Sequence, residues 1–169
     1  MKDDGEKYWG KYRGTVKENV DPDAQGRLLV QVLDVSSEYP STWAMPCLPI
    51  AGRRSGFFAL PTVGSQVWVE YENGNSDHPI WVGCFWGERE LPSPPPETPP
   101  GAMAFRTPFG NAITASDLPL PTGTVVLQCS SGAALILDAK GVTIKSGKGA
   151  TITMSGDTVD INSGALTVR

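Results

Sequence analysis

The residues that could do chemistry in this chain are few and lie far apart. His78 is the one histidine; it precedes a proline in a polar turn and has no Cys or His at ligand spacing, so we interpret it as a surface residue. Asp21 and Asp23 could act as paired carboxylates, but no nucleophile or acid accompanies them, and the Asp-Pro step favours a turn. The sequence therefore predicts no catalytic residue, no metal site and no cofactor.

The cysteines form no pattern that would hold a metal or a disulfide framework. Cys47, Cys84 and Cys129 are odd in number, widely spaced and without a CxxC pair, and each lies among apolar or small residues. We expect them to be buried free thiols.

The composition excludes several classes of protein. An apolar fraction of 40% is enough for a packed core, whereas 19 Gly and 15 Pro favour short strands and turns over helices. The net charge of -4 gives no basic surface for phosphate, so nucleic acid is not an expected partner. The charged N-terminal residues precede no apolar h-region, and we therefore expect a protein made in the cytoplasm without a signal peptide.

The first half of the chain reads as a small antiparallel barrel. Strong turn signals separate runs of alternating apolar residues, and there is no room for a crossover helix. Asn73-Gly74 is a hairpin signal between the last two runs. The expected strands are 12–20, 27–35, 42–48, 56–60, 66–71 and 79–85.

Aromatic residues allow a second interpretation of this barrel. Its five tryptophans could be platforms on which single-stranded nucleic acid stacks, but Lys and Arg rarely alternate with them, which favours packing in the core or at a subunit interface. Arg53-Arg54 is the one tight basic pair and is too small for a nucleic-acid groove. The tryptophans are Trp9, Trp43, Trp68, Trp81 and Trp86.

The composition changes twice after the barrel. A Pro-rich stretch cannot donate the backbone hydrogen bonds of a sheet and is typical of an extended spacer. Further on, apolar pairs two residues apart recur with Gly-containing turns between them, their starts 7, 10, 7 and 7 residues apart. These pairs are Leu135/Leu137, Val142/Ile144, Ile152/Met154, Val159/Ile161 and Leu166/Val168. The expected segments are 1–87 for the barrel, 88–104 for the linker, 105–132 for a lead-in and 133–169 for the repeat.

In a single ribbon of such short strands, the apolar pairs would be exposed to solvent on one side. Winding several identical ribbons round one axis would close the sheet edges and complete the burial of the ten side chains. Periodicity alone does not fix the number of chains.

The barrel residues resemble the OB domain of the baseplate spike family, which includes phage baseplate assembly protein V and the VgrG spikes of contractile injection systems. The resemblance covers roughly residues 8–87 and rests on an ordered set of short motifs. They are Gly14-Thr15-Val16, Asp21-Pro22, Gly26 to Val32, Trp43-Ala44, Gly52, Gly56-Phe57-Phe58, Leu60 to Val69 and Pro79 to Gly83. The repeat at the end of the chain resembles the same family's triple-stranded β-helix.

This resemblance implies an all-β fold and a mechanical function. It implies an N-terminal OB-fold collar attached to a baseplate hub protein, followed by an intertwined homotrimeric β-helix needle that punctures a target envelope. The linker has no room for the lysozyme domain of some relatives, so we expect no enzyme. No His-x-His motif is present, so a separate PAAR-type tip protein is expected to dock on Leu166, Thr167, Val168 and Arg169.

Two other functions stay open at this point. An OB-fold module for single-stranded nucleic acid would bind in a salt-dependent way and be monomeric. A receptor-binding or glycan-cleaving tail fibre would need a larger β-helix with a carboxylate-lined groove. The parent particle, whether a phage tail or an injection system carried to a target cell surface, is not specified by the residues.

Overall fold

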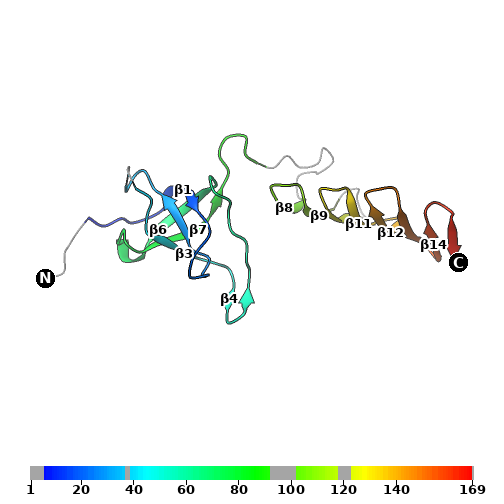
Figure 1. Cartoon of the computed structure of the whole chain (residues 1–169), viewed down its shortest axis with the longest axis horizontal. Coiled ribbons are helices and arrows are strands. Elements are labelled where there is room, and N and C mark those ends of the chain that lie inside the picture. Colours follow the sequence, from blue (N-terminus) through cyan, green and yellow to red (C-terminus); the bar gives the residue numbers. More distant parts are fainter. Residues whose placement is uncertain (1–5, 37–38, 92–101, 118–122, 169) are drawn as a thin grey trace. The chain divides into compact units, whose positions relative to one another are not determined.

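The computed structural model describes residues 6–36, 39–91, 102–117 and 123–168, and for Thr167 its backbone alone. The chain divides into two compact units, Met1–Leu91 and Pro92–Arg169 (Figure 1). Within the described residues nearly all regular structure is strand, and the one helical element is the 3-10 turn Glu72–Gly74. The all-β expectation is confirmed.

The first unit is a closed five-stranded barrel of OB type. Its strands are β1 (Tyr12–Glu18), β2 (Leu28–Gln31), β3 (Trp43–Pro46), β6 (Gln66–Tyr71) and β7 (Pro79–Phe85), and they pair in the order β1-β2-β3-β7-β6, with β6 returning to β1. The β3–β7 pair is parallel and the others are antiparallel. Register shifts in β1 and in the β6–β7 pair provide the local bends that closure requires.

Alternating residues of these strands fill the barrel. In β6 the pattern is regular, since Val67, Val69 and Tyr71 point inward while the residues between them are half-buried. Each fully buried Val or Leu contributes about 1.5–3 kcal/mol. The buried core consists of Val16, Leu28, Val30, Val32, Ala44, Val67, Val69, Tyr71 and Trp81.

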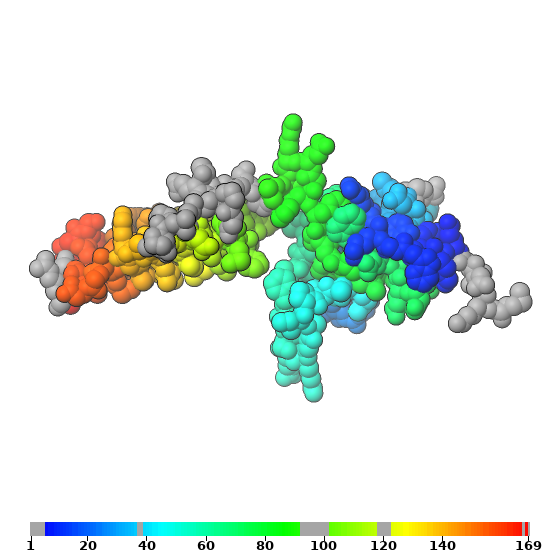
Figure 2. All heavy atoms as spheres, turned by 180° about the vertical axis from the view of Figure 1, so that it is seen from behind, coloured from blue at the N-terminus to red at the C-terminus, as the bar shows by residue number. Residues whose placement is uncertain are grey.

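One expected strand is wrong. Residues 57–60 are not in a strand; the chain instead forms the short hairpin of β4 (Ala51–Gly52) and β5 (Ser55–Gly56). This hairpin, coloured cyan-green, stands out from the surface of the first unit (Figure 2). Phenylalanine has a high strand propensity, so the sequence predicts a strand at Phe57-Phe58. The five barrel strands pair with one another, however, and none of them is free to pair with this segment.

The second unit is a single meander of eight antiparallel strands. They are β8 (Met103–Arg106), β9 (Ala112–Ser116), β10 (Thr124–Gln128), β11 (Ala133–Asp138), β12 (Gly141–Ser146), β13 (Thr151–Ser155), β14 (Thr158–Ile161) and β15 (Leu166–Val168). Each strand pairs with the next one along the chain (Figure 1). The sheet therefore begins at Met103, and it includes the segment expected as a lead-in as well as the repeat.

Candidate trimer interface

The register of the meander places the apolar pairs of the repeat on one face of the sheet. Leu135 lies opposite Ile144, Ile144 opposite Ile152, and Ile152 opposite Ile161. The second members form a parallel row through Leu137, Val142, Met154, Val159 and Val168, one strand after another. All ten residues singled out from the sequence thus share one surface, and we call it the apolar face.

The apolar face continues into strands that the sequence interpretation left out of the repeat. Leu127 pairs with Leu135 and with Ile113, and Ile113 pairs with Phe105. Val125 and Met103 extend the second row in the same way through Ala115. Met103/Phe105 and Val125/Leu127 are themselves apolar pairs two residues apart, which is the signal that could have identified them.

The opposite face is more polar. Thr143 pairs with Thr153, and Thr153 pairs with Asp160, so threonine and aspartate follow one another between the apolar rows. Threonine suits an exposed β position. The sheet therefore has one face suited to burial and one suited to water, although Val126 and Ile136 interrupt the polar face near β10 and β11.

The second unit has no core of its own. Among its described side chains none is buried, and many of those on the apolar face are more than a third exposed; Ile144 is 42% and Leu166 55% exposed. A single sheet layer has nothing to cover it, and stable domains need at least two packed layers. In the single chain the apolar face therefore has no layer of protein packed against it among the described residues of this unit.

Two glycines allow the tight stacking of the meander. A Cβ on Gly141 would lie 2.0 Å from the Met154 carbonyl oxygen, and one on Gly147 would lie 2.6 Å from the Ser131 carbonyl oxygen. Both glycines have a positive φ. No other residue fits these two turns without moving the neighbouring strand.

The remaining residues proposed from the sequence fall outside this arrangement or have structural roles. Leu166 and Val168 lie on the apolar face of β15, whereas Arg169 and the Thr167 side chain lie outside the described part of the chain. His78 is exposed, as expected. Cys47, Cys84 and Cys129 are free thiols, as expected, but the expectation that they are buried is wrong for the single chain, because all three are exposed.

Asp21 is a turn former and not a catalytic acid. Its carboxylate accepts the backbone N–H groups of Asp23, Gln25 and Arg27, and the Arg27 guanidinium donates to it at 2.6 Å. These contacts hold the pKa of Asp21 well below its usual range. Because the side chain is only 2% exposed and fully occupied by the turn, it is not available as a base.

The tryptophans differ in burial and in what they contact. Trp81 is buried in the barrel and donates from Nε1 to the Gly26 carbonyl oxygen at 3.2 Å. Trp68 stacks against Phe85 with ring centroids 4.6 Å apart, and the Arg13 guanidinium lies over both rings. Trp9 and Trp86 are exposed. The prediction of core packing is thus confirmed for Trp81.

Within the described ranges, no group of three or more His, Cys, Asp or Glu side chains could hold a metal ion. The same residues include no helix of the length and apolar character that crossing a bilayer requires.

The chain thus consists of a closed five-stranded barrel followed by an eight-stranded sheet whose apolar face is not buried in the single chain. Residues 12–86 match the type VI secretion system/phage-baseplate injector OB domain, and residues 102–167 match the phage baseplate V C-terminal trimerisation domain. None of the curated proteins compared with the chain matches it.

The two matches together cover most of the chain, the OB domain first and the trimerisation domain after it. The chain therefore belongs to the phage baseplate V family, a family of structural baseplate proteins that is not a known class of enzyme. The trimerisation domain supports self-association as a homotrimer, and membership implies assembly into the baseplate of a phage or injection system.

Proposed function

We propose that the chain is the central spike of a contractile tail or injection machine. Three copies pack the apolar faces of their β8–β15 sheets against one another around a common axis and form a needle. The observation that carries this proposal is the apolar face itself, which runs through all eight strands of a unit that has no buried side chain among its described residues.

The face supports a stiff needle for a physical reason. Burying its sixteen inward positions between three sheets would remove from water the side chains that the single chain leaves exposed. Backbone pairing already runs from β8 to β15 within one chain, so side-chain packing carries most of the contact between protomers. Whether the three chains also intertwine as a triple-stranded β-helix stays a prediction.

The OB barrel gives the needle its attachment. A closed barrel has no free sheet edge, so it can transmit force to a partner without unravelling. We propose that the barrel binds the baseplate hub protein, and that contraction of the machine drives the needle through the target envelope.

Docking of a PAAR-type tip protein on Leu166, Thr167, Val168 and Arg169 stays a prediction of the sequence. β15 is the last strand of the sheet and has a strand paired with it on one side only, which is compatible with such a contact at the end of the needle.

The experiment is to delete the gene in the producing cell and to purify particles with and without complementation. Quantitative mass spectrometry should find three copies of the chain per particle, and particles without it should fail to penetrate envelope vesicles. Particles that lack the chain altogether, or that penetrate equally well without it, would exclude the role of central spike.

A nucleic-acid role for the OB barrel has no comparable support. The chain is acidic overall, and the basic pair beside the aromatic residues of the barrel surface, Arg53-Arg54, is too small for a nucleic-acid groove.

A further inference from the structure

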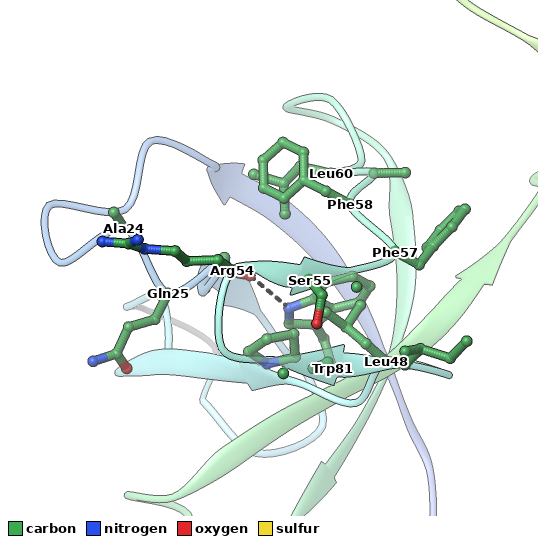
Figure 3. A pocket seen from close by; sticks show the side chains of 16 residues that line it. Ala24, Gln25, Leu48, Arg54, Ser55, Phe57, Phe58, Leu60 and Trp81 are labelled. Carbon is green, nitrogen blue, oxygen red and sulfur yellow. Dashed lines mark hydrogen bonds between the residues drawn. The ribbon is translucent and has the colours of Figure 1, made fainter.

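The β4–β5 hairpin forms one wall of a cleft on the first unit. The cleft has a volume of about 490 Å³, and its floor and opposite wall come from the barrel (Figure 3). Leu48, Leu60 and Trp81 line it from the barrel side, and Phe57 and Phe58 line it where the chain leaves the hairpin. The lining is mainly apolar, which is suited to holding a side chain of a partner.

The rim of this cleft carries large apolar side chains that are exposed to solvent. Ile50 is 67%, Phe57 48% and Phe58 78% exposed, and all three border the same cleft. A cluster of large exposed apolar side chains marks an interaction surface. No Asp, Glu, His or Cys lines the cleft, and its polar side chains are those of Gln25, Arg54 and Ser55.

The hairpin tip adds positive charge. Arg53 and Arg54 occupy the turn, and neither forms a salt bridge with any described residue. The sequence between Tyr39 and Val69 contains no Asp or Glu, although the chain as a whole carries 18. The hairpin tip is thus a small positively charged patch on an acidic protein, and it lies directly beside the apolar cleft.

The hairpin is held in a fixed shape. The Phe57 amide donates to the Ile50 carbonyl oxygen at 3.0 Å, and a Cβ on Gly56 would lie 2.7 Å from that same oxygen. Arg54 has a left-handed φ of 58°, as a tight turn requires. A preformed surface of this kind binds with a smaller loss of conformational entropy.

We propose that the β4–β5 hairpin and its cleft bind a segment of a different baseplate protein, one that presents an apolar side chain flanked by carboxylates. The apolar side chain fills the cleft, and the carboxylates pair with the guanidinium groups of Arg53 and Arg54. This inference rests on the proposed function, because it assigns the attachment of the OB unit to one surface and states the chemistry of its partner.

Chemical modification with phenylglyoxal tests the proposal, because this reagent reacts with exposed guanidinium groups and does not require the hairpin backbone to unfold. The purified full-length trimer and the assembled particle are treated under the same conditions, and mass spectrometry measures the modification of Arg53 and Arg54, which are exposed in the single chain. The expected result is rapid modification in the free trimer and protection in the particle.

The other outcomes overturn the proposal in separate ways. Protection of the guanidinium groups already in the free trimer would mean that a second copy of the chain covers the hairpin. Modification in both samples would mean that nothing covers it. Absence of the chain from the particle would contradict the proposed function itself, and the first two outcomes leave that function untouched.

Variants separate binding from folding. R53E/R54E and F57S/F58S change side chains at the surface, so both should remain trimeric with an unchanged melting temperature. Incorporation into particles should fall at least about tenfold in each, because R53E/R54E reverses the charges that pair with the partner and F57S/F58S removes apolar side chains that border the cleft. F109S, at an 87% exposed phenylalanine of the second unit, is the matched control and should be incorporated normally. Normal incorporation of both hairpin variants would overturn the proposal.

Discussion

Ile144 and Ile152 lie directly opposite one another on the apolar face, across the β12–β13 pair, and in the single chain they are 42% and 37% exposed. In the core of a folded domain, isoleucine side chains are usually almost fully buried. One residue further along each strand, Thr143 and Thr153 form the corresponding pair on the other face. The contrast between these two pairs is the basis of the trimer proposal.

Replacing Gly141 should disrupt the meander. In Gly141→Ala the new Cβ meets the Met154 carbonyl oxygen at 2.0 Å, so the β12–β13 pair must separate, and we expect a loss of several kcal/mol. Gly156→Ala is the control, because Gly156 also has a positive φ but nothing lies within 4 Å of its Cβ position; its expected cost is about 1 kcal/mol. Guanidinium unfolding curves compare them. Equal midpoints would show that the close approach does not matter.

Removing the Asp21 carboxylate should destabilise the barrel in a pH-dependent way. Asp21→Asn loses the pairing with Arg27, so at pH 7 the melting temperature of the barrel should fall by several degrees. Because the pKa of Asp21 is lowered in the fold from its ordinary value of 3.8, the stabilisation is complete above that value. It is lost as the pH falls further toward the folded-state pKa.

The wild-type and Asp21→Asn melting temperatures should therefore draw progressively closer as the pH falls below 3.8. Circular dichroism at a series of pH values measures this. Asp34→Asn, at an exposed carboxylate, is the control and should follow the wild type at each pH. A gap between wild type and Asp21→Asn that stays constant down to acid pH would contradict the electrostatic explanation.

Trp81 should report on the barrel core. Trp81→Phe removes the Nε1 hydrogen bond to the Gly26 carbonyl oxygen and leaves that region underpacked, for an expected loss of about 1–2 kcal/mol. Trp86→Phe changes an exposed tryptophan and should be nearly neutral. Urea unfolding monitored by far-ultraviolet circular dichroism compares the two variants. Equal free energies of unfolding for the two variants would show that the Trp81 hydrogen bond does not stabilise the barrel.

Much of the barrel could be predicted from local patterns. The run from Gln66 to Tyr71 alternates regularly and the strand has those bounds, and Asn73 and Gly74 adopt the left-handed conformations that the turn signal implies. The parallel β3–β7 pair could not be predicted, because it joins residues far apart in sequence. The hairpin at Ala51–Gly56 was also missed, since its strands are too short to show a period.

The extent of the apolar face was predicted only in part. The pairs after Ala133 recur at nearly constant spacing, so their common face follows from strand alternation alone. The pairs before it are separated by a turn that contains Phe109 and by the long connection between β9 and β10, and these irregular lengths conceal the repeat. Only the register of β8, β9 and β10 shows that Phe105, Ile113 and Leu127 belong to the same row.

The most direct test of the central claim is the solution mass of the full chain and of two double variants by light scattering. The wild type should have about three times the chain mass of 18.0 kDa, and T143D/T153D on the polar face should stay at that mass. I144D/I152D places carboxylates on the apolar face, where burial of unpaired charge is prohibitive, and it should be monomeric. A monomeric wild type, or an I144D/I152D variant that remains trimeric, would contradict the assignment of this face as the trimer interface.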